Sequence, residues 1–85
     1  MKITVEIPEY KPEVGFRFLW EDNFEISTHT ETNAVLISAN KEGLISMARH
    51  LLSLAQENIP SGYHIHLDEY NSLNDGSIEL IVVRK

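Results

Sequence analysis

The segment NKEGLISMARHLLSLAQENIP, residues 40–60, has the clearest helical periodicity in the chain. At 100° per residue its apolar side chains fall within one half-circle. These side chains are Leu44, Ile45, Met47, Ala48, Leu51, Leu52, Leu54, Ala55 and Ile59. Asn40 is a suitable N-cap, Glu42 lies where the helix dipole favours an acid, and Pro60 ends the helix. We therefore predict one amphipathic helix that packs its apolar face inward and exposes its polar face, including His50, to solvent.

Period-two alternation on either side of this helix predicts six strands. Four precede the helix, at residues 2–7, 16–20, 24–29 and 34–39, and two follow it, at 63–68 and 78–83. The expected fold is α+β, with a single mostly antiparallel sheet of about six strands and the helix packed on one face. The helix lies between the fourth and fifth strands, so it permits a right-handed crossover that would make those two strands parallel. Phe16, Phe18 and Trp20 share one side of the second strand, where we expect core packing.

The predicted sheet has more apolar surface than one helix can cover. In the fourth strand Val35 and Ile37 lie on one face and Leu36 on the other, and the sixth strand is also apolar on both faces. Loops, curvature of the sheet, a second copy of the chain or another protein could cover the remainder. The sequence leaves these alternatives open.

Size and composition predict a single domain, residues 1–85, without disulfide bonds. Hydrophobic residues make up 42% of the chain, cysteine is absent and the formal net charge is −6. No apolar run approaches the length of a membrane span, and the absence of cysteine is typical of a cytoplasmic protein. The negative charge makes nucleic acid and anionic membranes poor partners. A protein with a basic surface fits better, although acidity also serves solubility alone.

The cluster His64, His66 and Asp68 is the one place with possible site chemistry. At period two on a strand the three side chains share a face, where they could bind a divalent metal or act as an acid and base pair. The alternative is a solvent-exposed strand face on which a histidine pairs with a neighbour such as Glu79. We favour the surface interpretation, and we expect no catalytic residue, no metal and no cofactor.

From Asn40 onward the run NKEGLISMARHLLSLAQENIPSGYHIHLDEY, followed by GSIELIVVRK, resembles the bacterial immunity protein 32 family. The matching features are the helix start at Asn40, Gly43 and Leu44, the Leu-rich helix, the strand at residues 64–68 and the C-terminal segment that begins with residues 76–80. The resemblance implies an α+β fold and a protein without enzymatic activity that binds and neutralises a toxin encoded next to it.

The leading hypothesis is therefore a cytoplasmic immunity-type protein that blocks its toxin by occlusion. We expect the contacts to come from acidic side chains near the N-terminal strands, namely Glu21, Asp22, Glu25 and Glu31. Two rivals remain: a small metal-binding or histidine-based enzyme centred on His64, His66 and Asp68, and a homodimeric housekeeping domain.

Overall fold

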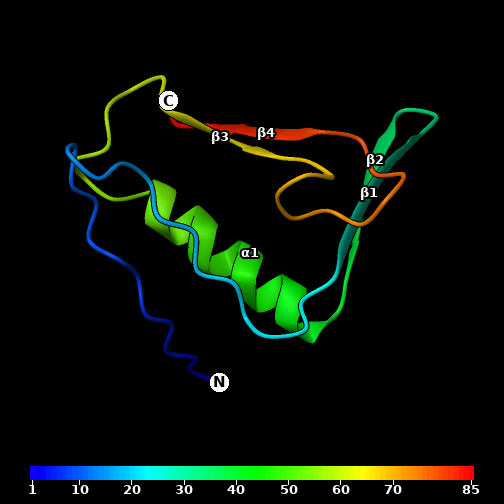
Figure 1. Ribbon diagram of the computed structural model, residues 1–85, viewed down its shortest axis with the longest axis horizontal. Helices are drawn as coiled ribbons and strands as arrows, with labels where there is room; N and C mark the ends of the chain where they lie inside the picture. The colour runs from blue at the N-terminus through cyan, green and yellow to red at the C-terminus, as the bar shows by residue number, and fades with distance from the viewer.

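Helix α1, Lys41–Leu54, runs through the middle of the molecule, and two β-hairpins and an extended N-terminal segment are arranged around it (Figure 1). The computed structural model describes residues 1–85. Strand β1, Ile26–Glu31, pairs antiparallel with β2, Ala34–Ala39. Strand β3, His64–Leu67, pairs antiparallel with β4, Leu80–Val83. These hairpins form two separate two-stranded sheets.

The prediction of a single six-stranded sheet is therefore wrong. Residues 2–7 and 16–20 form no strand, and instead run as extended chain beside α1 (Figure 1). Alternation in sequence marks a chain with one apolar side, whereas a strand also needs a partner edge for its backbone groups. Strands β2 and β3 are not paired with each other, so the parallel crossover that the position of the helix would permit is absent as well.

The other four strands form close to their predicted positions. The first hairpin turns between Glu31 and Ala34, which are paired across it. Asn33 occupies this two-residue turn with a φ of 60°, a left-handed conformation that asparagine tolerates better than most residues. The sequence thus locates four of the strands, although β1 begins at Ile26 and β4 at Leu80, each two residues later than predicted.

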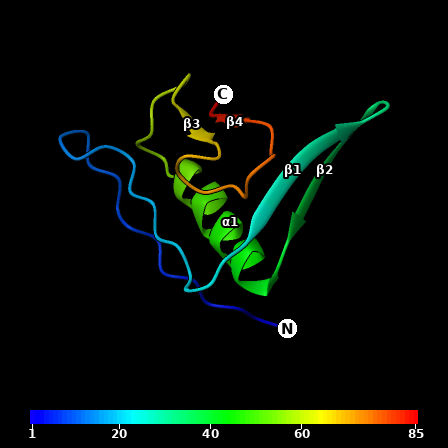
Figure 2. The ribbon, with the colours of Figure 1, turned by 45° about the vertical axis from the view of Figure 1, so that its right-hand side comes forward.

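The first hairpin is joined to the second through its base. The Asn74 amide donates to the Ile26 carbonyl at 2.8 Å, and the Ile78 amide donates to the Thr28 carbonyl at 3.1 Å. Both Ile26 and Thr28 are buried. The far end of this hairpin extends away from the rest of the molecule (Figure 2).

The start of α1 confirms the predicted N-cap. The Asn40 side-chain Oδ1 accepts the Gly43 amide at 2.8 Å and the Glu25 amide at 3.0 Å. Its Nδ2 donates to the Asn23 carbonyl at 2.9 Å. One side chain therefore both caps the helix and fixes the base of the first hairpin against it.

The rotation of α1 differs from the prediction. Its buried residues are Gly43, Ser46, His50, Ser53 and Leu54. Leu44, Leu51 and Leu52 are instead 56%, 48% and 52% exposed. The small residues face inward because the chain packs very close to the helix there: a Cβ on Gly43 would lie 2.5 Å from the Glu25 carbonyl oxygen.

The core lies between α1, the second hairpin and the extended segment, in two clusters. One contains Tyr10, Leu54, Ile59 and Ile65, and the other contains Ile26, Leu67 and Leu73. Only 12 of the 85 residues are buried, so much apolar surface remains outside the core.

Candidate partner-binding surface

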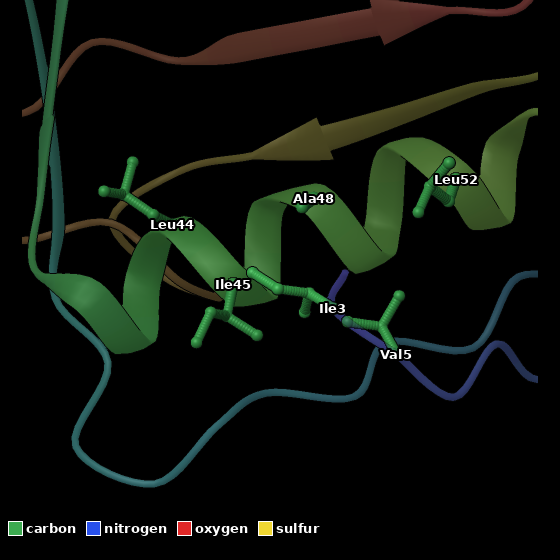
Figure 3. A pocket seen from close by; sticks show the side chains of 6 residues that line it. All are labelled: Ile3, Val5, Leu44, Ile45, Ala48 and Leu52. Carbon is green, nitrogen blue, oxygen red and sulfur yellow. The ribbon is translucent and has the colours of Figure 1, made fainter. Parts of the chain in front are cut away.

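An apolar groove lies between α1 and the N-terminal segment. It has a volume of about 320 Å³ and only hydrophobic residues line it, namely Ile3, Val5, Leu44, Ile45, Ala48 and Leu52. Figure 3 shows these side chains along one side of the helix and on the segment beside it. A contiguous exposed apolar surface of this kind is typical of contact with another macromolecule.

Arg49 fixes the extended segment beside the helix. Its Nε donates to the Glu6 carbonyl at 3.1 Å and one terminal nitrogen donates to the Leu19 carbonyl at 3.0 Å. The other terminal nitrogen lies 3.0 Å from a carboxylate oxygen of Glu21. A guanidinium can serve three acceptors at once in this way because its donors are fixed in a planar fork.

The four predicted acidic contact residues do not form a single cluster. Glu21, Asp22 and Glu25 lie in the segment that leads into β1, whereas Glu31 ends β1 at the far end of the hairpin. The Glu21 carboxylate already forms an ion pair with Arg49 of the same chain, so it is less available to a partner protein. The exposed acids are Asp22 and Glu25 at the base of the hairpin and Glu31 at its tip.

Exposed apolar side chains lie on β2, on the face of the hairpin opposite to the one from which Glu31 projects. Val35 and Ile37 on β2 are both exposed, opposite Thr30 and Thr28 on β1. The hairpin thus carries an apolar strip, Val35 and Ile37, on one face and the Glu31 carboxylate on the other, and its outer half projects from the body of the molecule (Figure 2). An apolar centre with a charged rim is the usual composition of a protein interface.

The sequence missed the exposed face of α1, because its apolar half-circle was assigned to the core. The signal that could have found this face is the row of small residues on the opposite side, Gly43, Ser46 and Ser53. Small side chains repeated on one helix face permit close packing of backbone, and the Ser46 hydroxyl here accepts the Glu21 amide at 2.8 Å. The buried face of a helix can thus be the one with the smaller side chains rather than the one with the more hydrophobic side chains.

His50 is buried rather than solvated, and is 2% exposed. Its Nε2 accepts the Leu19 amide at 3.0 Å, and its ring packs edge-on against Trp20 with centroids 4.3 Å apart. Burial, reinforced by the positive charge of Arg49, lowers the pKa of His50 to about 4. The neutral ring therefore carries its proton on Nδ1, a buried atom with no hydrogen-bond partner.

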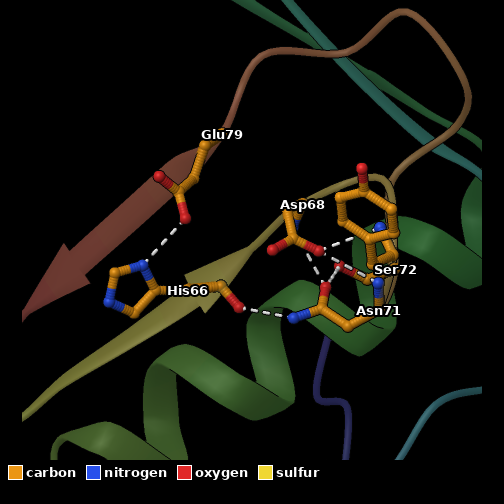
Figure 4. Close-up of polar contacts among 6 residues, drawn as sticks. His66, Asp68, Asn71, Ser72 and Glu79 are labelled. Carbon is orange, nitrogen blue, oxygen red and sulfur yellow. Dashed lines mark hydrogen bonds and ion pairs between the residues drawn. The ribbon is translucent and has the colours of Figure 1, made fainter.

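His64, His66 and Asp68 do not converge. The two histidine rings lie 5.1 Å apart, and His66 Nδ1 is 2.9 Å from a carboxylate oxygen of Glu79, which confirms the expected pairing with Glu79 (Figure 4). Asp68 Oδ1 instead accepts the amides of Tyr70 and Asn71 in the turn after β3. No group of three or more His, Asp or Glu side chains in the structure is placed to hold a metal ion.

Comparison with known protein families finds one match. The model of the family described as Immunity protein 32 matches residues 34–85, which is more than half of the chain. The matched region contains β2, α1, β3 and β4, and stops short of the extended segment and β1. No curated protein and no solved structure matches the chain. The structure contains no helix with the length and hydrophobicity needed to cross a membrane.

Proposed function

Because the chain belongs to the immunity protein 32 family, we propose that it binds a cognate bacterial toxin in the cytoplasm and neutralises it by occlusion, without catalysing a reaction. The match to the family model over residues 34–85 is the observation that carries this proposal. Binding alone suffices for such a function, so the protein needs a contact surface rather than an active site.

The contact surface that we propose is the β1–β2 hairpin, from the acidic residues that precede β1 to the tip. Val35 and Ile37 supply its apolar centre, with Asp22 and Glu25 at one end and Glu31 at the other. A projecting hairpin can enter a concave site on the partner, where its apolar strip would be desolvated. Part of this surface, strand β2, lies within the matched region.

The charge of the chain supports a partner with a basic surface. The formal net charge is −6, and the three exposed acids lie at the two ends of the hairpin, outside the apolar strip. Acidic groups at the rim accelerate encounter with a basic protein and penalise acidic ones. We therefore expect the association rate to fall as the salt concentration rises.

The test is co-expression with the toxin encoded by the neighbouring gene, read as growth rescue and co-purification. The wild-type chain should restore growth, and a triple variant Asp22→Lys, Glu25→Lys, Glu31→Lys should not. The control carries Glu9→Lys, Glu13→Lys and Glu57→Lys, three exposed acids outside the hairpin. Both triple variants change the net charge equally, so a difference between them reports location.

Two outcomes contradict the proposal at different levels. Failure of the wild-type chain to rescue growth or to co-purify with the toxin rejects the function. Equal rescue by the two triple variants rejects the hairpin as the contact surface while leaving the function in place.

A further inference from the structure

Three residues of α1 and its C-cap, Ala55, form a straight row on the exposed side of the helix. Leu44, Ala48, Leu51 and Ala55 are all exposed, and they follow one another at intervals of four, three and four residues. This spacing is that of the contact seam between two packed helices. Large and small side chains alternate along the row, and no charged residue interrupts it.

The alternation is complementary to itself when reversed. If a second α1 is laid antiparallel on the first, with a two-fold axis midway between positions 49 and 50, Leu44 faces Ala55 of the second copy. In the same arrangement Ala48 faces Leu51. Every layer then places a leucine against an alanine, which fills space evenly and lets the helix axes approach to about 8 Å. A parallel arrangement in register would instead place leucine on leucine and alanine on alanine.

We propose that this row, the α1 seam, binds a second copy of the chain through antiparallel packing of the two α1 helices. Closed two-fold dimers are the commonest oligomers, and their interfaces must complement themselves, as this seam does. The absence of charge within the seam favours a second copy over a basic partner, because an acidic chain would recognise a basic protein through its carboxylates. The antiparallel arrangement also brings Lys41, whose side chain is 80% exposed, to the end where the other copy carries Glu57.

The size of the seam sets the strength of the dimer. A 14-residue helix is about 21 Å long and about 10 Å wide at its contact face. Ile3 and Leu52, which line the apolar groove together with the seam residues Leu44 and Ala48, widen the footprint on each copy. The total remains at the lower end of specific interfaces, below about 1,200 Å², so we expect a reversible dimer rather than an obligate one.

Sedimentation equilibrium of the purified chain from about 10 μM to about 1 mM tests the proposal, because weak specific interfaces dissociate in this range. The wild type should follow a monomer–dimer equilibrium. Leu51→Ala leaves a gap in two symmetric layers and Ala48→Leu overfills the same layers. Each single change should therefore weaken dimerisation about tenfold or more.

The double variant Ala48→Leu, Leu51→Ala is the decisive sample, because it restores a leucine against an alanine with the order exchanged. Its dissociation constant should return to within about threefold of the wild type. The matched control is Val83→Ala, an exposed apolar residue on β4, which should leave dimerisation unchanged. Both seam positions are exposed, so circular dichroism melting curves should show that all variants remain folded.

A chain that stays monomeric at the highest concentration overturns the proposal. A dimer that the single changes do not weaken also overturns it, because the seam is then not the interface. A double variant that dimerises as weakly as the worse single variant excludes the antiparallel register. The seam and the hairpin surface share no residue. Loss of dimerisation and loss of toxin neutralisation are therefore separate results.

Discussion

His50 is a titratable side chain held inside the protein among aromatic rings, and it should make folding stability depend on pH. Its pKa is about 4 in the folded chain against 6.5 for an unperturbed histidine. As pH falls below 6.5 the unfolded chain binds a proton that the folded chain does not, so the free energy of unfolding decreases. The loss should approach about 3 kcal/mol near pH 4, where the folded chain also becomes protonated. Above pH 7 this contribution to stability is fully present.

Urea denaturation at pH 7.5, 5.5 and 4.5 measures this effect. His50→Gln retains a neutral acceptor for the Leu19 amide but does not titrate, so its stability should vary less over the same range. Carboxylates contribute to acid denaturation in both proteins, and the difference between the two curves isolates His50. Parallel curves for the wild type and the variant would refute the assignment.

Glycine at position 43 decides how α1 meets the first hairpin, which makes Gly43→Ala an informative change at the scale of elements. In an exposed helix interior this substitution stabilises by up to about 1 kcal/mol. Here the added Cβ would lie 2.5 Å from the Glu25 carbonyl oxygen and 3.1 Å from the Cβ of Ala39. We expect the variant to lose about 2 kcal/mol of unfolding free energy, because backbone must move to relieve the overlap.

Chemical denaturation measures this loss, with Ala48→Gly as the reciprocal control. Ala48 is exposed in the monomer, so at a protein concentration too low for dimerisation its replacement should cost only the ordinary propensity difference of about 1 kcal/mol. A stabilised Gly43→Ala variant would show that the helix and the base of the hairpin are not in close contact.

The sequence predicts the elements better than their faces. Local patterns locate α1 and its cap at Asn40, because capping and helical periodicity depend on neighbouring residues. The inward face of α1 depends on segments distant in sequence: Ser46 accepts the Glu21 amide and His50 accepts the Leu19 amide. These bonds make a polar face the buried one. The hydrophobic pattern alone predicts the opposite rotation.

The same distinction applies to the candidate site. Glu25 and Glu31 could be named as exposed acids from the sequence, but their separation by the length of β1 follows only from the hairpin. The pairing of Glu21 with Arg49 and the use of Asp68 in a turn are likewise tertiary features. The exposed seam of α1 likewise depends on the orientation of the helix about its axis, which tertiary contacts determine.

At the scale of the whole molecule, side chains rather than a continuous sheet hold the N-terminal segment on the body. No backbone amide in residues 2–9 donates to a backbone carbonyl. In the stretch that follows, amides donate mainly to side chains, as at Leu19 and Glu21. Alternation in residues 16–20 predicts the apolar side of the chain correctly, because the rings of Phe16, Phe18 and Trp20 pack around His50. Alternation in residues 2–7 and 16–20 does not, however, predict whether these residues pair as strands.

Hydrogen exchange distinguishes this arrangement from a six-stranded sheet. Amides of residues 2–9 should exchange almost as fast as in an unfolded chain, whereas those of Leu19 and Glu21 should be protected by their side-chain acceptors. Arg49→Ala removes the bonds to the Glu6 and Leu19 carbonyls and the pairing with Glu21, so it should reduce protection at Leu19, whose amide keeps its acceptor on His50, and lower stability by about 2 to 3 kcal/mol. Arg49→Lys keeps the charge but cannot serve three acceptors, and it should give most of the same loss. Lys41→Ala removes only an exposed ion pair with Glu42 and should change neither quantity. If alternate amides across residues 2–7 are instead protected in the wild type, these residues pair as a strand, and the extended segment depends on that pairing rather than on Arg49.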